Sequence, residues 1–257
     1  MSMHFARFAL PLLALLSAAP AAAIPEEELD VPYVPTPMRV VDRMLDLAQL
    51  RANEYLIDLG SGDGRIPIAA AARGARALGV DIDPARVREA QAAARLRGAE
   101  TRARFRRQDL FDTPIGEADV VTMYLLPDIN LRLRPRLLTE LRPGTRILSH
   151  NFDLGDWRPD ASEELDASRI HMWIVPAVVG GSWTMRLADG TALPLVLEQR
   201  FQQVTGTLGT MPLTEVRLRG TSFRFKAGDR SFDGIVRDAA IEAAPGTGPG
   251  WSATRSD

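Results

Sequence analysis

The sequence has no cysteine, and lysine is almost absent from it. Without cysteine there is no disulfide framework, no thiolate nucleophile, no lipid-anchored cysteine and no cysteine-based zinc site. Lys226 is the only lysine, so arginine supplies the remaining positive charge. The three histidines lack clustered acids, and we therefore expect no metal site. A formal net charge of -2 argues against a strongly electrostatic partner, so no nucleic acid is expected.

Beyond residue 24 there is no apolar run long enough to span a membrane. The first 23 residues have Arg7, an apolar stretch over 8–19 and the small residues Ala21-Ala22-Ala23. This stretch is shorter than the roughly 20 residues of a spanning helix. The pattern predicts a cleaved signal peptide over residues 1–23 and an exported, periplasmic protein. An uncleaved membrane tether and a mitochondrial-type presequence remain alternatives.

Residues 24–176 alternate short apolar strands with helical segments, which predicts an α/β domain with a mostly parallel sheet. A helix beginning at Thr36-Pro37, with Thr36 as its N-cap, precedes the first strand. A long loop is expected over residues 151–168. Ligands of such sheets bind outside the carboxyl ends of the strands. The predicted strands are 55–59, 77–83, 102–107, 118–124, 146–149 and 170–175.

Residues 177–257 lose the helical periodicity and alternate short strands with glycine turns, including one at Gly206. This pattern predicts a small C-terminal antiparallel β domain, a meander or half-barrel. We expect Trp157, Trp173 and Trp183 to pack between the two domains rather than to form a peptide groove. The expected strands are 182–187, 193–201, 213–218, 222–225, 234–236 and 251–253.

The most informative stretch is Asp58-Leu59-Gly60-Ser61-Gly62-Asp63-Gly64-Arg65, which follows the first strand and opens a helix. Its glycine spacing differs from the dinucleotide fingerprint, and the Lys-Ser/Thr of a P-loop is absent. Backbone N–H groups at such a turn suit a carboxylate or phosphate. The pattern resembles motif I of the class I S-adenosylmethionine-dependent methyltransferases, which implies a Rossmann-like sheet with flanking helices.

Further polar residues follow the next strands at the spacing that S-adenosylmethionine would need. Asp58 or Asp63 suits its ammonium group, Asp81 its ribose hydroxyls and Asp109 its adenine amino group. Ile82 and Leu110 suit the flat faces of the adenine. Taken singly, each acid is also compatible with an ordinary loop residue or helix cap.

The run Pro32-Tyr33-Val34-Pro35-Thr36-Pro37 narrows the resemblance. With the glycine stretch it looks like the mitochondrial-type seven-strand lysine methyltransferases, which act on ATP synthase subunit c and the adenine nucleotide translocase. The likeness covers about residues 31–160 and excludes the C-terminal β domain. It implies that Tyr33 and Thr36 fold over the cofactor and that Tyr124 lines the substrate entrance. The expected cofactor-binding residues are Tyr33, Thr36, Asp58, Gly60, Ser61, Gly62, Asp63, Gly64, Asp81, Ile82, Asp109, Leu110 and Tyr124.

The resemblance implies a methyltransferase acting on a protein lysine. We expect a monomer, and a membrane-proximal substrate if the N-terminal apolar segment acts as a tether. A lysine acceptor must lose its proton before transfer, because its free pKa is about 10.4. Tyr124 and His150 are the candidates to assist. Methylation of a small molecule or lipid is an alternative, as is an exported binding protein without turnover. We interpret the arginines at 102, 104, 106 and 107 as solvent-facing side chains of a strand and the residues that follow it.

Overall fold

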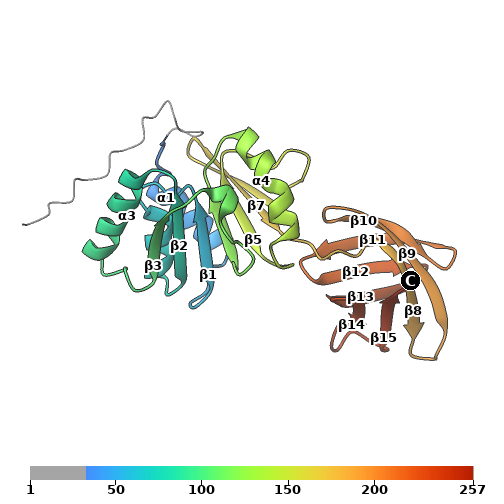
Figure 1. Ribbon diagram of the computed structural model, residues 1–257. Helices are drawn as coiled ribbons and strands as arrows, with labels where there is room; N and C mark the ends of the chain where they lie inside the picture. The colour runs from blue at the N-terminus through green and yellow to red at the C-terminus, as the bar shows by residue number, and fades with distance from the viewer. Residues whose placement is uncertain (1–32, 257) are drawn as a thin grey trace, which may run out of the picture.

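The computed structural model describes residues 33–256, and the predicted signal peptide over 1–23 lies outside them. A seven-stranded sheet with its helices forms one part of the molecule, and a closed eight-stranded barrel forms the other (Figure 1). Within the described residues no helix is both long and apolar enough to cross a membrane. The predicted α/β sheet followed by an antiparallel β region is therefore confirmed.

The sheet has the strand order β3-β2-β1-β4-β5-β7-β6. Strands β1 to β5 run parallel, whereas β7 is antiparallel to both β5 and β6. The strands are β1 (Tyr55–Leu59), β2 (Arg76–Asp81), β3 (Ala103–Arg107), β4 (Val120–Met123), β5 (Arg146–His150), β6 (Ala161–Leu165) and β7 (Ser168–Ile174). The helices are α1 (Met38–Leu47), α2 (Arg65–Ala72), α3 (Pro84–Leu96) and α4 (Pro127–Thr139), with a short 3₁₀ turn at Leu110–Asp112.

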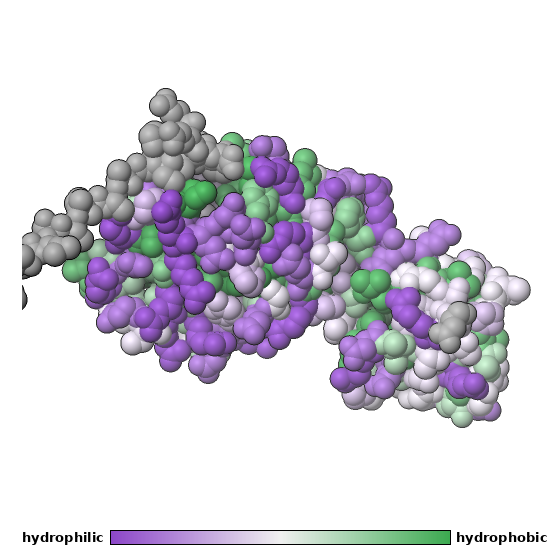
Figure 2. Space-filling model, in the orientation of Figure 1, coloured by the Kyte–Doolittle hydropathy of each residue, from purple (hydrophilic) through white to green (hydrophobic). Residues whose placement is uncertain are grey.

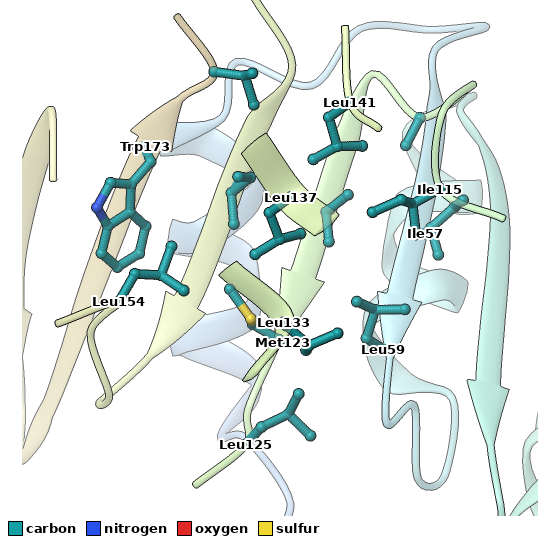
Figure 3. Close-up of a cluster of buried hydrophobic side chains, with 14 of the residues drawn as sticks. Ile57, Leu59, Ile115, Met123, Leu125, Leu133, Leu137, Leu141, Leu154 and Trp173 are labelled. Atoms are coloured by element: carbon teal, nitrogen blue, oxygen red, sulfur yellow. The ribbon is translucent and has the colours of Figure 1, made fainter. Parts of the chain in front are cut away.

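Alternating side chains bury both faces of the sheet, as expected for parallel strands between helices. Leu56 of β1 points toward α1 and α2, whereas the adjacent Ile57 points toward α4. On the α4 side, Leu133 and Leu137 of that helix pack over β1 and β4 (Figure 3). The two apolar layers hold the carboxyl ends of β1, β2 and β4 together at one edge.

Two sequence-based expectations for this domain are wrong. Residues 161–165 form β6 instead of loop, because their backbone pairs with β7 at the edge of the sheet. The N-cap of α1 is Pro37 and not Thr36. The Thr36 hydroxyl forms a hydrogen bond with His150, which is 114 positions away in sequence, and therefore does not cap the helix.

The barrel is an up-and-down meander that closes where β15 pairs with β8. Its strands are β8 (Gly181–Leu187), β9 (Ala192–Arg200), β10 (Gln203–Leu208), β11 (Met211–Arg219), β12 (Ser222–Ala227), β13 (Arg230–Arg237), β14 (Ala240–Ala243) and β15 (Trp251–Arg255). Side chains fill the interior, with Phe225 stacked on Phe232 at 5.0 Å between ring centroids. As in other eight-stranded barrels, packed side chains occupy the centre.

The C-terminal region is thus a closed barrel and not a half-barrel, because β10 and β14 complete it. Gly206 is part of β10 and not of a turn. A Cβ there would lie 2.0 Å from the carbonyl oxygen of Val196 on β9. Glycine is therefore needed for close strand approach, and glycine inside a strand is easily mistaken for a turn.

The barrel meets the sheet domain at the amino end of β5. Gly220, in the turn between β11 and β12, lies against Gly144, so that an added Cβ would be 3.0 Å from the Gly144 Cα. Beside this contact, Trp157 stacks on Phe201 with centroids 5.8 Å apart and donates Nε1–H to Gln202. These contacts confirm the expected packing of Trp157 between the domains, whereas the same expectation is wrong for Trp183, which is buried in the interior of the barrel.

Candidate active site

The glycine turn between β1 and α2 uses each glycine differently. Gly60, Gly62 and Gly64 all have positive φ, between 52° and 80°. A Cβ on Gly62 would lie 2.6 Å from the Tyr33 ring, so glycine lets the segment before α1 close onto the turn. A Cβ on Gly64 would lie 2.6 Å from Phe105 and 2.8 Å from the Ala90 Cβ. Glycine at position 64 therefore lets α3 and β3 pack closely against the start of α2.

Asp81 at the end of β2 holds the turn in place. One carboxylate oxygen accepts the Gly62 N–H at 2.9 Å, and the other accepts the Asp83 N–H at 2.9 Å. Burial raises the pKa of Asp81. Each oxygen keeps a second lone pair, so the carboxylate is still able to accept hydroxyl groups.

The expectation that the N–H groups of the turn are free for a carboxylate is wrong for most of them. The N–H groups of Gly60 and Ser61 both donate to the Val80 carbonyl. The N–H of Gly62 donates to Asp81, and that of Gly64 donates to the Ser61 carbonyl. The turn is therefore built mainly from its own hydrogen bonds.

Asp58 is buried at the carboxyl end of β1, where it is 2 % exposed. The Thr122 hydroxyl of β4 donates to one of its oxygens at 2.7 Å. Burial raises the pKa of Asp58 to about 7, and the nearby Asp81 and Asp63 act in the same direction. A cation placed beside this carboxyl would stabilise its charged form.

The segment before α1 lies against the turn through Tyr33 and Thr36. The Arg86 guanidinium stacks on the Tyr33 ring, 4.0 Å from its centroid. Arg65 donates to the Thr36 carbonyl at 2.7 Å and pairs with both oxygens of Asp63. Burial acts to raise the pKa of Asp63, but the hydrogen bonds and charge of Arg65 outweigh it and lower that pKa.

Tyr124 follows β4 and lies among three residues from the end of β5. Its ring centroid is 3.9 Å from that of His150 and 6.2 Å from that of Phe152. Asn151 donates its side-chain amide N–H to the Tyr124 hydroxyl at 3.3 Å. The other end of the Asn151 amide accepts the Arg169 N–H at 2.8 Å, which orients the amide.

His150 lies behind Tyr124 and does not line the cavity described below. It is 2 % exposed, and its Nδ1 is 3.0 Å from the Thr36 hydroxyl. Burial lowers its pKa to about 4, so the ring is neutral at pH 7. The arrangement does not support His150 as a catalytic base; it supports a role in positioning Thr36 and Tyr124.

Sequence reasoning missed Asn151 and Phe152. Both follow the carboxyl end of a sheet strand, the position at which ligand-contacting residues of this architecture concentrate. Asn151 also has φ +65°, a conformation that asparagine tolerates better than most residues. Position after β5 was therefore a usable signal, but the contact with Tyr124 depends on the folded sheet.

A cavity that is partly open to solvent joins these groups. Ile82 is 48 % exposed in its wall, and Leu110 lies beside it. Asp109 caps the 3₁₀ turn by accepting the Phe111 N–H with one oxygen. Gly64 is the one expected cofactor residue outside the lining. The expected residues in the lining are Tyr33, Thr36, Asp58, Gly60, Ser61, Gly62, Asp63, Asp81, Ile82, Asp109, Leu110 and Tyr124.

S-adenosylmethionine fits this donor set. The buried Asp58 carboxyl suits its ammonium group, and Asp81 keeps acceptor capacity for ribose hydroxyls. The exposed apolar side chain of Ile82 and the neighbouring Leu110 suit a flat base. The sheet, the glycine turn and this acidic series define a class I S-adenosylmethionine-dependent methyltransferase.

Comparison with known proteins supports the assignment to this class. The family model described as ANTKMT methyltransferase domain matches residues 58–161. A protein-lysine N-methyltransferase of Saccharolobus islandicus is 41% identical over 152 residues, which are 58% of this chain and 94% of that protein. The chain therefore belongs to the ANTKMT methyltransferase family.

Two further matches carry different names. The mouse adenine nucleotide translocase lysine N-methyltransferase is 36% identical over 52% of this chain and 58% of its own length. The crystal structure of an RNA methyltransferase from Salinibacter ruber, in complex with S-adenosyl-L-homocysteine, has 48% identity and a TM-score of 0.56. That match covers 57% of this chain and 96% of the Salinibacter chain. The names of these relatives thus agree on methyl transfer and differ in the acceptor, which is a protein lysine in two of them and RNA in the third.

Proposed function

We propose that this methyltransferase acts on the side-chain nitrogen of a lysine in a protein. The observation that carries the proposal is the 41% identity with a protein-lysine N-methyltransferase across nearly the whole of that relative. The cavity around Tyr124 is compatible with it. Tyr124 lines the cavity together with the apolar residues Leu125 and Ile129, so an amine inserted there would meet a hydroxyl group and apolar side chains.

The residues of this chain then bind the cofactor, orient the acceptor amine and keep water away from it. S-adenosylmethionine, when bound, supplies a methyl group on a sulfonium for in-line displacement. Asp58 accepts from its ammonium group and Asp81 from its ribose. The Tyr124 hydroxyl, already an acceptor for Asn151, orients the incoming amine through its remaining lone pair. The apolar surroundings lower the pKa of a lysine, which favours its neutral, reactive form.

The test is transfer of a labelled methyl group to four acceptor pools: cell-envelope protein, the same protein with its lysines chemically blocked, extracted lipid, and total RNA. Lys226→Arg enzyme is used throughout, because it removes the only lysine of the enzyme itself. We expect label on lysine in the untreated protein alone. Label on RNA, on extracted lipid, or equally on blocked protein would overturn the proposed acceptor, whereas absence of cofactor binding would contradict the methyltransferase itself.

We also propose, from the N-terminal sequence alone, that the protein is exported by residues 1–23, or held at the membrane by them. Cell fractionation with N-terminal sequencing tests both. A periplasmic protein beginning near residue 24 supports cleavage and export, and a membrane fraction with an intact N-terminus supports the tether. A soluble cytosolic protein with residue 1 intact would contradict both.

A further inference from the structure

The outer edge of the sheet carries an unusual concentration of arginine. β3 is the outermost strand, and the end of α3 lies beside it. We call this surface the basic edge. It consists of the exposed residues Arg95, Leu96, Arg97, Glu100, Arg102, Arg104 and Arg106, with five arginines and one acid. Arg104 and Arg106 lie on the face of β3 away from α3, because the alternate residues Ala103 and Phe105 pack against that helix. In Figure 2 hydrophilic residues cover much of the visible face of the sheet domain, and Figure 1 places the barrel at the opposite end of the molecule from β3 and α3.

The arginines of the basic edge differ from most other arginines of the protein in their partners. Within residues 33–256, none of the five forms an ion pair, and only Arg102 has a protein acceptor, the Gly74 carbonyl at 2.9 Å. Elsewhere arginines such as Arg65, Arg136 and Arg146 bind carboxylates at 2.6–2.8 Å. With a net charge of -2 for the whole chain, this positive charge is local.

Protection of an edge strand explains part of this pattern. Charged side chains on β3 would prevent pairing with another sheet, which accounts for Arg104 and Arg106. It does not account for Arg95 and Arg97, which belong to the end of α3. Nor does it account for Leu96 between them, whose side chain is 89 % exposed.

We propose that the basic edge docks on a bilayer surface that contains anionic lipids. Arginines would lie at the headgroups, and Leu96 would enter the boundary with the acyl chains, a division typical of interfacial helices and polybasic segments. A single-stranded nucleic acid would require aromatic platforms. Phe105 of β3 is only 7 % exposed and packs against α3. The Tyr55 ring, near Arg106, is partly buried and already carries the Arg76 guanidinium at 5.2 Å from its centroid.

The basic edge also leads to the active site. Arg107 at the end of β3 donates to the carbonyl of Ile82, whose side chain lines the cavity. Docking along β3 would therefore bring the cavity to the level of the lipid surface, while the barrel stays at the far end of the molecule. The proposal goes beyond the proposed function and does not depend on the identity of the acceptor.

The test is co-sedimentation of the full chain with neutral phosphatidylcholine vesicles and with vesicles containing about 30 % phosphatidylglycerol. The apolar N-terminal residues are present in every sample and would bind both kinds of vesicle, so the readout is the difference between them. The variant is Arg104→Gln/Arg106→Gln on β3. Its matched control is Arg217→Gln/Arg219→Gln, two exposed alternate arginines on β11 of the barrel.

We expect the anionic preference to fall about twenty-fold in the β3 variant and to stay unchanged in the β11 control. It should also weaken as the salt concentration rises. Leu96→Gln should weaken binding to anionic vesicles with the charge intact. Equal binding to both vesicles, an equal loss in the β11 control, or tighter binding to an RNA oligonucleotide than to anionic vesicles would overturn the proposal. Circular dichroism melting confirms that each variant is folded.

Discussion

The sheet domain and the barrel bury their apolar side chains in different ways. In the sheet, helices cover the faces but leave the carboxyl ends of β1, β2 and β4 open, and the cavity lies there. In the barrel every strand is paired on both sides, and aromatic rings fill the centre. All residues that line the cavity therefore belong to the sheet domain.

The attachment point strengthens this contrast. The barrel contacts Gly144 at the amino end of β5, whereas His150 and the cavity lie at its carboxyl end. The five residues of β5 separate the two by roughly 16 Å. The barrel is therefore not a lid over the cavity, and the following changes should affect the two regions differently.

The largest expected effect is on stability. Phe225→Ala empties the barrel centre and should lower the free energy of unfolding of the barrel by about 4 kcal/mol. Affinity for S-adenosylmethionine should stay within about two-fold, because the barrel does not reach the cavity. Ile57→Ala, in β1 directly before Asp58, should reduce both quantities. Thermal unfolding and calorimetric titration measure them. If Phe225→Ala weakens binding as much as Ile57→Ala does, the two regions are coupled.

Next in size is the effect of a methyl group on the glycine turn. Gly62→Ala adds a Cβ at 2.6 Å from the Tyr33 ring, at φ +52°. We expect S-adenosylmethionine to bind about 100-fold more weakly, which corresponds to about 2.7 kcal/mol. Gly250→Ala is the control, because a Cβ there meets nothing within 4 Å and φ is ordinary. Wild-type affinity in Gly62→Ala would show that Tyr33 does not need to contact the turn.

The third effect is a pH dependence that Asp58 should impose on the sheet domain. Since its pKa in the folded protein is about 7, above the ordinary value, the carboxyl stabilises the ligand-free fold when protonated. This stabilisation is complete below the ordinary pKa of an aspartate and is lost as the pH rises through about 7. Binding of an ammonium group needs the charged carboxylate, so affinity should rise up to about ten-fold per pH unit below 7 and then level off.

Calorimetric titration between about pH 5.5 and 8.5 measures this slope. Asp58→Asn should remove the slope while keeping the acceptor for the Thr122 hydroxyl. Asp112→Asn, an exposed acid outside the cavity lining, should leave it unchanged. A slope that survives in Asp58→Asn would assign the titration to another group.

The smallest expected effect concerns Asn151. Asn151→Gly keeps the positive φ but removes the donor to the Tyr124 hydroxyl. We expect kcat to fall about ten-fold, with the KM for S-adenosylmethionine unchanged. Asn53→Gly is the control, since it changes another asparagine at positive φ, 70°, on the exposed surface. Equal kcat values for the two variants would limit Asn151 to a structural role.

Several features of the site could be predicted because they depend on neighbouring residues. The spacing of Gly60, Gly62 and Gly64 after an apolar strand specifies a strand, a turn and a helix. Asp81 and Asp109 follow the next two strands, and parallel strands bring their carboxyl ends to one edge. The local sequence pattern and the general geometry of parallel sheets were sufficient to predict where these residues lie.

Other features depend on contacts between distant segments, which no local pattern reports. Whether Thr36 caps α1 or bonds His150 is decided by which donor and acceptor the folded chain brings together. Closure of the barrel depends on the pairing of β15 with β8, about 70 residues apart in sequence. The hydrogen bonds that the N–H groups of the glycine turn donate to Val80 and Asp81 also depend on a contact between two strands.

The class of cofactor could be inferred from the sequence, because the glycine turn and the acids suited to S-adenosylmethionine lie at the ends of consecutive strands. How these groups are charged and held depends on the folded chain. Burial sets the pKa of Asp58 near 7 and that of His150 near 4, and burial is a property of everything packed around a residue. For the same reason only the folded chain showed that the barrel stands at the opposite end of β5 from the cavity.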